Sequence, residues 1–145
     1  MNQRPRHILV IDDSQVVRKI LEVGLRRSGF AVETFEDGVA ALRSLQEPGR
    51  SALPDLIILD VLLPKMDGYQ VARHLKTHPD LAGIPIVMLS RSDGVVDRLK
   101  GRLAGARAYV TKPFQIDELV QVIGAHMEAP RQPGERQEES GVPRP

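Results

Sequence analysis

The amino-acid sequence predicts an α/β fold built on a five-stranded parallel sheet. Five short apolar runs alternate along the chain with segments of helical periodicity. Most of these runs are continuously apolar, which is typical of strands that helices cover on both faces. The chain of 145 residues is long enough for one domain with a sizeable core. We therefore expect a doubly wound sheet with right-handed crossovers and helices on both faces.

The five strands are expected where the apolar runs lie. These runs are Ile8–Ile11, Ala31–Phe35, Leu56–Leu59, Ile86–Leu89 and Ala108–Thr111. A doubly wound sheet of this flavodoxin-like type has the strand order 2-1-3-4-5. Its ligand crevice lies outside the carboxyl ends of the strands, at the switch point between the first and third strands.

Five helices are indicated by capping residues and by the spacing of apolar residues between the strands. The residues expected to begin the first four are Ser14, Asp37, Asp67 (in a capping box with Gln70) and Ser92 or Asp93, and the fifth helix is expected over about 116–127. The residues expected to face the core are Val17, Ile20, Leu21 and Leu25 in the first helix, Ala41, Leu42 and Leu45 in the second, Val96, Leu99 and Leu103 in the fourth, and Leu119, Val120 and Ile123 in the fifth.

Composition narrows the range of functions. The formal net charge is +1, so neither nucleic acid nor an anionic membrane is an expected partner, and the absence of cysteine excludes disulfides and thiolate chemistry. No apolar stretch is long enough to span a membrane and the N-terminus lacks a signal region, so we expect a cytoplasmic protein. Residues 1–6 and the Pro- and Glu-rich segment 128–145 are expected to be disordered, with one domain at 7–127 between them.

Charged residues at the strand ends predict one chemical site. Asp12 and Asp13 close the first strand, Asp60 closes the third, and Lys112-Pro113 follows the fifth. The carboxyl ends of parallel strands meet at one edge of the sheet, so these groups should gather there. Close carboxylates repel one another by about 1–4 kcal/mol per pair, and a bound cation reverses the sign. Mg²⁺ prefers such oxygen ligands, and a lysine supplies a point charge for phosphate.

Each of these residues also has a simpler explanation when it is taken alone. An aspartate in such a position is often a helix cap or a turn residue, and Lys112 could be a solvated side chain. Ser90, at the end of the fourth strand, could donate to a phosphoryl oxygen or merely cap the next turn. The placement of three aspartates at neighbouring strand ends is what favours a metal site.

These residues lie in stretches that resemble the receiver domain of bacterial two-component response regulators. The matching stretches are Ile11–Ser14, Leu59–Tyr69, Met88–Ser90 and Thr111–Phe114, and the resemblance covers residues 7–127. The segment from Met88 to Phe114 is also similar to single-domain, chemotaxis-regulator-like receivers of twitching-motility and related chemosensory systems. The resemblance implies a receiver that a histidine kinase phosphorylates in a Mg²⁺-dependent reaction.

The resemblance assigns the acceptor and the metal ligands. It implies that Asp60 is the phosphoacceptor, whose carboxylate forms an aspartyl phosphate. It also implies that Asp13 and Asp60 coordinate Mg²⁺ directly, and Asp12 directly or through water. The backbone carbonyl of Leu62 would complete the protein ligands.

The resemblance also implies how the phosphoryl group is held and how the signal leaves the domain. Lys112, before a cis Pro113, and the Ser90 hydroxyl would hold phosphoryl oxygens. Tyr109 would be the switch aromatic, which moves inward when Ser90 is drawn toward the phosphoryl group. A downstream protein partner would then bind the face formed by the fourth helix, the strand Ala108–Thr111 and the fifth helix.

Two residues depart from the family pattern. Arg91 follows Ser90 where the family usually has a small residue, and a long cation there could control access to the aspartyl phosphate. Leu62 is apolar where many members have a polar side chain, so it cannot position a hydrolytic water. Neither change touches the residues expected to carry out phosphorylation.

Three functions were weighed against these observations. The leading hypothesis is a stand-alone response regulator receiver, a signalling protein with self-catalysed phosphotransfer and slow autodephosphorylation rather than a conventional enzyme. The alternative is a phosphorylation-independent, receiver-like docking module, which Arg91 keeps open. A haloacid-dehalogenase-type phosphatase or phosphotransferase is disfavoured, because Leu62 stands where that family has a second aspartate.

Overall fold

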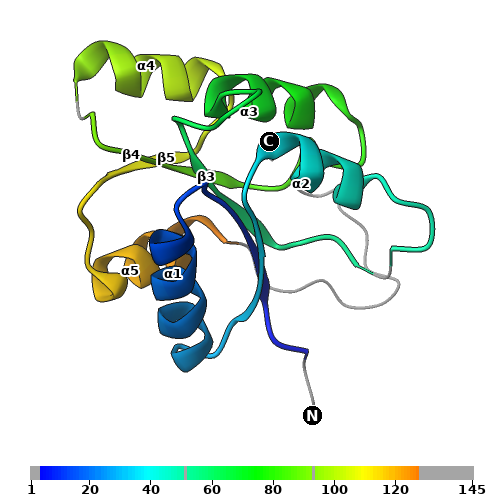
Figure 1. Cartoon of the computed structure of the whole chain (residues 1–145), viewed down its shortest axis with the longest axis horizontal. Coiled ribbons are helices and arrows are strands. Elements are labelled where there is room, and N and C mark those ends of the chain that lie inside the picture. Colours follow the sequence, from blue (N-terminus) through cyan, green and yellow to red (C-terminus); the bar gives the residue numbers. More distant parts are fainter. Residues whose placement is uncertain (1–3, 51, 93, 128–145) are drawn as a thin grey trace, which may run out of the picture.

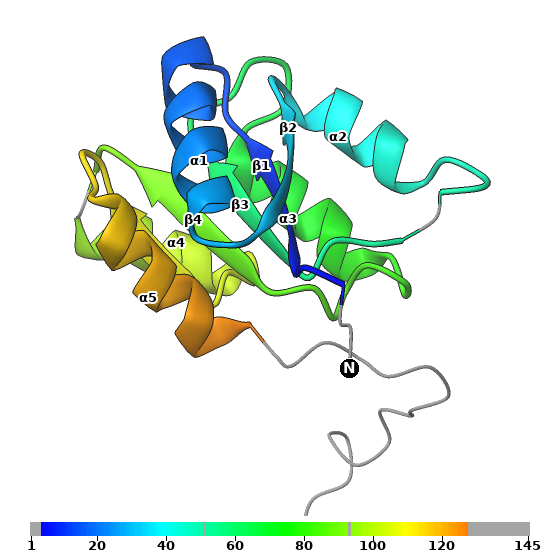
Figure 2. The same ribbon diagram turned by 90° about the horizontal axis from the view of Figure 1, so that it is seen from below.

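The computed structural model describes residues 4–50, 52–92 and 94–127, which form a three-layer α/β structure (Figures 1 and 2). Its strands are β1 (His7–Ile11), β2 (Ala31–Phe35), β3 (Leu56–Asp60), β4 (Ile86–Ser90) and β5 (Ala108–Thr111). All neighbouring strands pair in parallel, in the order β2-β1-β3-β4-β5. The predicted fold class and strand order are confirmed.

Five helices cover the two faces of this sheet. They are α1 (Gln15–Arg27), α2 (Gly38–Leu45), α3 (Gly68–Thr77), α4 (Val95–Leu103) and α5 (Ile116–His126). Figure 1 shows α1 and α5 on one face, and α2, α3 and α4 on the other. Among the described residues, no helix has the length and apolar character needed to cross a membrane. Disorder was predicted for residues 1–6 and 128–145; of these, 1–3 and 128–145 lie outside the described residues, whereas the Arg6 carbonyl oxygen accepts a hydrogen bond from the Ala31 amide at 2.9 Å.

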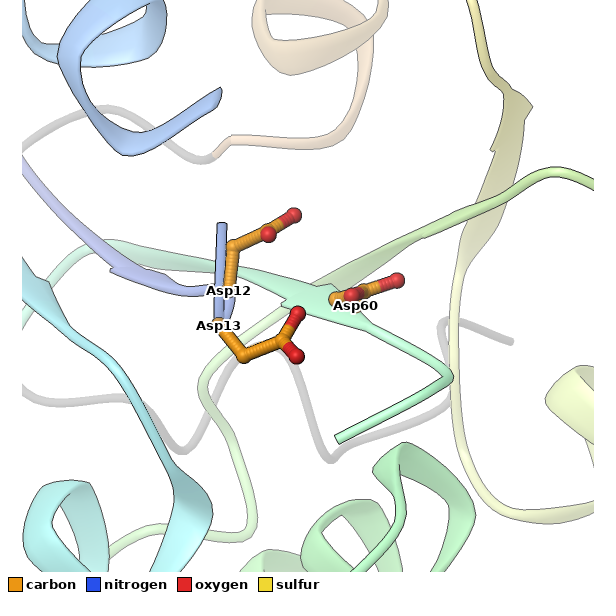
Figure 3. A group of neighbouring side chains, drawn as sticks. All are labelled: Asp12, Asp13 and Asp60. Carbon is orange, nitrogen blue, oxygen red and sulfur yellow. The ribbon is translucent and has the colours of Figure 1, made fainter. Parts of the chain in front are cut away.

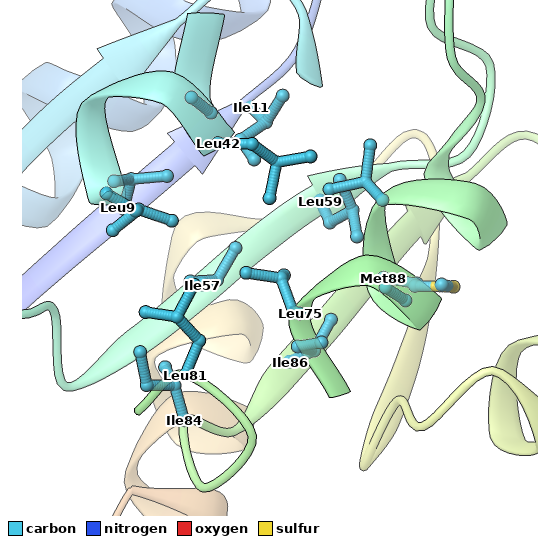
Figure 4. Close-up of a cluster of buried hydrophobic side chains, with 14 of the residues drawn as sticks. Leu9, Ile11, Leu42, Ile57, Leu59, Leu75, Leu81, Ile84, Ile86 and Met88 are labelled. Carbon is cyan, nitrogen blue, oxygen red and sulfur yellow. The ribbon is translucent and has the colours of Figure 1, made fainter. Parts of the chain in front are cut away.

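Alternate side chains of the central strands fill the two apolar clusters that join these layers. The cluster on the side of α2 and α3, drawn in Figure 4, contains Leu9, Ile11, Ile57, Leu59, Ile86 and Met88 from the sheet, together with Leu42 and Leu75. The cluster on the side of α1 and α5 contains Ile8, Val10, Leu56, Ile58, Val87 and Leu89, together with Leu21, Leu25, Leu119 and Ile123. Every one of these residues is buried, so the strands are covered on both faces as predicted.

Three of the predicted helix starts are confirmed. The Ser14 hydroxyl accepts from the Val17 amide at 3.2 Å, the Asp37 carboxylate accepts from the Ala40 amide at 2.8 Å, and Asp67 forms a capping box with Gln70. The predicted start of α4 is wrong. Its N-cap is Gly94, which has no side chain to accept a hydrogen bond, so Ser92 is not the cap; Asp93 lies outside the described residues.

The predicted buried face of α4 is also wrong. Val96, Leu99 and Leu103 are 64%, 53% and 77% exposed, while the small residues Gly101 and Ala104 face the interior. A methyl group added at Gly101 would lie 3.1 Å from the Tyr109 ring, so only a helix with a small residue there can approach β5 so closely. The sequence periodicity correctly groups the large apolar residues of α4 on one face. The opposite face of the helix, however, is the one that packs against the protein.

One expected core residue of α1 is likewise exposed. Ile20 is 48% exposed, whereas Leu21 and Leu25 are completely buried and Val17 packs at the edge of the core. The helix therefore rests on a narrower apolar stripe than its sequence pattern indicates.

Candidate functional site

Three carboxylates converge at the carboxyl ends of β1 and β3. Asp12 and Asp13 follow β1, Asp60 is the last residue of β3, and one oxygen of each lies within 4.8 Å of the others. Figure 3 shows the Asp13 carboxylate turned toward Asp60. Asp12 and Asp60 are buried and Asp13 is exposed, so one side of the cluster is open to solvent. The structure thus brings together the three aspartates that the sequence predicted to meet.

Asp12 is held rigidly by its neighbours. Its amide donates to the Phe35 carbonyl of β2 at 3.1 Å, and its carboxylate accepts from the Ser14 amide at 2.9 Å. Arg18 of α1 donates to the Asp12 carbonyl oxygen at 2.7 Å. These contacts fix both the backbone and the side chain of a completely buried carboxylate.

Asp60 is fixed by the close approach of the chain that follows it. Gly68, at the start of α3, donates to the Val61 carbonyl oxygen at 2.8 Å. A Cβ atom at Gly68 would collide with the Asp60 carbonyl oxygen and the Val61 Cα atom. Only glycine therefore allows α3 to begin directly against the end of β3.

Lys112 supplies the positive charge of the site. Its ammonium lies 2.9 Å from an Asp12 oxygen and 3.4 Å from an Asp60 oxygen, and its side chain is only 14% exposed. The Lys112 amide donates to the Ser90 carbonyl oxygen at 2.7 Å, and the bond to Pro113 is cis, as the resemblance implied. The lysine thus reaches across the strand ends from β5 to β1 and β3.

The protonation of Asp60 reflects this crowded environment. Burial raises the pKa of the Asp60 carboxyl from 3.8 to about 6, and the Asp12 carboxylate contributes in the same direction. The Lys112 ammonium and a backbone hydrogen bond from Leu62 oppose this rise in the pKa. The ionised form of Asp60 is therefore only partly stabilised by its neighbours, and a bound cation would stabilise it further.

The Ser90 hydroxyl lies at the end of β4 beside this cluster. Its oxygen is buried and accepts a hydrogen bond from the Ser92 amide at 3.1 Å, which leaves the hydroxyl proton able to donate. Tyr109 is in the middle of β5, where its ring is half-buried and its hydroxyl oxygen is fully buried. Both residues lie on the strands that the sequence placed them on.

The two departures from the family pattern lie at the surface. Leu62 is 68% exposed, so its side chain points away from the core. Arg91 is also exposed, and no hydrogen bond or ion pair joins it to any residue in the parts of the chain that the structure describes. Asp93, two residues further along the chain, lies outside those parts.

Several supporting residues were missed at the level of sequence. Arg18 holds the Asp12 backbone, and Lys65, whose φ is 69°, pairs with Asp37 at 3.4 Å and links the loop after β3 to α2. Their contacts depend on the tertiary structure, and no spacing in the sequence indicates them. Gly68 could have been identified from the sequence, because a glycine directly after a capping aspartate is compatible with close backbone contact.

The residues present fit a divalent cation. Mg²⁺ takes oxygen ligands, binds to proteins through few carboxylates and keeps several waters. Asp12, Asp13 and Asp60 offer three such oxygens, and the exposed Asp13 leaves room for water and substrate on one side. Lys112 alone cannot balance three carboxylates, which gives the cation a favourable electrostatic site.

Comparisons with known proteins agree with this geometry. Residues 8–124 match the model of the response regulator receiver domain. The chain is 38% identical over 120 residues to protein PilG of Pseudomonas aeruginosa, covering 83% of this chain and 86% of PilG. It spans only about half the length of several other curated relatives.

Solved structures give the same result. The chemotaxis protein CheY4 of Vibrio cholerae superposes with a TM-score of 0.78 at 28% identity, covering 85% of this chain and 99% of CheY4. The receiver domain of the sensor histidine kinase PA1611 of Pseudomonas aeruginosa, which has a magnesium ion coordinated in its active-site cleft, superposes with a TM-score of 0.75 at 30% identity, covering 84% and 97%. With its strand order, its acidic cluster and these matches, the chain belongs to the response regulator receiver domain family.

Proposed function

We propose that this protein is phosphorylated on Asp60 by a histidine kinase in a Mg²⁺-dependent reaction and passes the signal to a protein partner. The observation that carries this proposal is the position of the Asp60 carboxylate. It lies at a strand end within 4.8 Å of two further carboxylates and 3.4 Å from the Lys112 ammonium. A phosphoryl group on Asp60 would therefore be surrounded by groups that hold it.

The residues have distinct tasks in this proposal. An Asp60 oxygen attacks the phosphorus of a phosphohistidine, the new O–P bond forms, and the P–N bond breaks with its electron pair returning to the imidazole. The Lys112 ammonium and the Ser90 hydroxyl hold the phosphoryl oxygens. Asp12, Asp13, Asp60 and the carbonyl of Leu62 would hold Mg²⁺, which neutralises charge on the transferring group.

The signal would leave through the face formed by α4, β5 and α5. Tyr109 lies on β5 within this face, and the serine that would bind the phosphoryl group lies on the adjacent strand β4. Helix α4 exposes Val95, Val96, Leu99 and Leu103, with exposed fractions of 53–82%. An apolar surface of this kind favours a protein as the downstream partner.

We propose residues 7–127 as the extent of the receiver domain.

The first test of this proposal needs no knowledge of the natural kinase. The full chain is incubated with acetyl phosphate and Mg²⁺, and the intact mass is measured. We expect the mass of one phosphoryl group to be added to the native chain and to Asp80→Asn, an exposed control, but not to Asp60→Asn. Omitting Mg²⁺ and adding EDTA should also abolish the added mass.

Two outcomes would contradict the proposal. Undiminished phosphorylation of Asp60→Asn would show that another residue is the acceptor. A native chain that remains unphosphorylated by acetyl phosphate, and by the histidine kinases of its own genome with labelled ATP, would favour the phosphorylation-independent docking module instead.

A further inference from the structure

Arg98 of α4 contacts β5 at three points. Its guanidinium carbon lies 5.2 Å from the centroid of the Tyr109 ring. The same guanidinium donates to the Tyr109 carbonyl oxygen at 3.4 Å and to the Thr111 hydroxyl at 3.1 Å. One exposed side chain thus lies over an aromatic ring and also donates hydrogen bonds to the backbone and to a hydroxyl group of the same strand.

The Tyr109 ring also lies against the backbone of α4. A Cβ atom added at Gly101 would be 3.1 Å from one ring carbon of Tyr109 and 3.2 Å from the Met88 sulfur. The absence of a side chain at Gly101 therefore creates the space that the ring occupies. Because Arg98 and Gly101 are three residues apart on one helix, both contacts place α4 over the same ring.

The hydroxyl group of Tyr109 contributes little to holding the ring in this position. Its oxygen is buried and has no hydrogen-bond partner in the described part of the chain. The neighbouring phenol of Tyr69 donates to the Asp97 carbonyl oxygen at 3.3 Å; burial and the adjacent Tyr109 hydroxyl raise the pKa of Tyr69 to about 12. Packing against Gly101 and the contact with Arg98 therefore stabilise the inward position of the ring.

We propose that Arg98 is a positioning residue that holds Tyr109 in its inward position and ties α4 to β5. The inference rests on the proposed function in one respect, namely that Tyr109 is the switch residue. If phosphorylation also favours the inward ring, Arg98 and the phosphoryl group act on the same equilibrium between inward and outward rings. Each then increases the effect of the other on the inward population. An exposed cation–π contact changes such an equilibrium by about two- to fivefold.

The tyrosine content allows a direct measurement of the ring position. The chain has two tyrosines and no tryptophan, so Tyr69→Phe leaves Tyr109 as the only strong fluorophore. In this background we would compare the native Arg98 with Arg98→Gln and Arg98→Lys, and with Arg102→Gln as a control at an exposed arginine of the same helix. Quenching of Tyr109 fluorescence by acrylamide reports how far solvent reaches the ring, and circular dichroism confirms folding of each variant.

We expect the ratio of outward to inward rings to rise about two- to fivefold in Arg98→Gln, with a corresponding rise in quenching. Arg98→Lys keeps the charge but lacks the planar fork, so its quenching should lie between the two. Arg102→Gln should match the parent. Quenching of Arg98→Gln and Arg98→Lys that equals that of the parent would overturn the positioning role, and Arg98→Lys decides the matter if the glutamine variant does not fold.

A second measurement separates this inference from the proposed switch. Beryllofluoride with Mg²⁺ mimics a phosphoryl group on aspartate, and its binding is followed by the rise in melting temperature of the full chain. We expect the beryllofluoride midpoint of Arg98→Gln to exceed that of the parent by the factor by which the inward population has fallen, which is at most about two- to fivefold. An unchanged midpoint in a variant with increased quenching would overturn the switch role of Tyr109 while supporting the positioning role of Arg98.

Discussion

Replacing Asp60 with asparagine is expected to stabilise the metal-free protein at neutral pH. Burial and the nearby Asp12 raise the pKa of the Asp60 carboxyl from 3.8 to about 6, although Lys112 opposes this. At about 1.36 kcal/mol per pKa unit, ionising Asp60 in the folded state costs about 3 kcal/mol of stability. An uncharged amide of the same shape should recover most of this free energy.

The direction of the pH dependence follows from the same values. Between about pH 4 and pH 6, the folded protein keeps a proton on Asp60 that the unfolded chain has released. The contribution of Asp60 to the free energy of unfolding should therefore fall as the pH rises through this window. The advantage of Asp60→Asn should be absent below about pH 4 and complete above about pH 6.

Urea unfolding in the presence of EDTA measures this effect. The midpoints of the native chain, Asp60→Asn and the exposed control Asp80→Asn are compared at several pH values by circular dichroism. The control should follow the native chain closely. If Asp60→Asn were no more stable than the native chain at neutral pH, or equally stabilised at low pH, the reasoning from burial and charge would be refuted.

Further predictions concern the metal, the backbone, the far end of the sheet and access to the site. Millimolar Mg²⁺ should raise the melting temperature of the native chain, and Asp13→Asn should lose that rise. Gly68→Ala should cost about 1–3 kcal/mol in urea unfolding, because its methyl group meets the backbone of Asp60. Burial lowers the pKa of His7 below 6.5, so the contribution of His7 to stability should fall as the pH drops below that value, and His7→Gln should be stabilised relative to the native chain at the lower pH. Arg91→Ala should shorten the lifetime of the aspartyl phosphate without altering Mg²⁺ affinity; a half-life within about twofold of the native one would show that Arg91 is a neutral surface residue.

The sheet and the acidic cluster could be predicted from sequence for a common reason. Continuously apolar runs identify buried parallel strands, and the residue at the end of each run is then placed at one edge of the sheet. Asp12 and Asp60 were located in this way, and so was Lys112 after β5. Strand order followed from the fold class and needed no information about individual contacts.

The fourth helix could not be predicted in the same way. Its large apolar residues, such as Leu99, suggested a buried face, but Gly101 and Ala104 are the residues that contact the interior. Periodicity identifies two faces of a helix, and the choice between them depends on how much space the neighbouring strand leaves. Contacts such as that of Arg98 with Tyr109 depend on this choice and could not be seen in the sequence.

The outward apolar residues of α4 also bear on how such a protein diverges in evolution. Val95, Leu99 and Leu103 add little to the core, so their replacement should change folding stability by no more than about 0.5 kcal/mol. Asp12 and Asp60 are buried and paired with Lys112 at the strand ends, so these residues cannot change so freely. A lineage can therefore exchange the apolar surface of α4 while the carboxylate and lysine site at the strand ends stays the same.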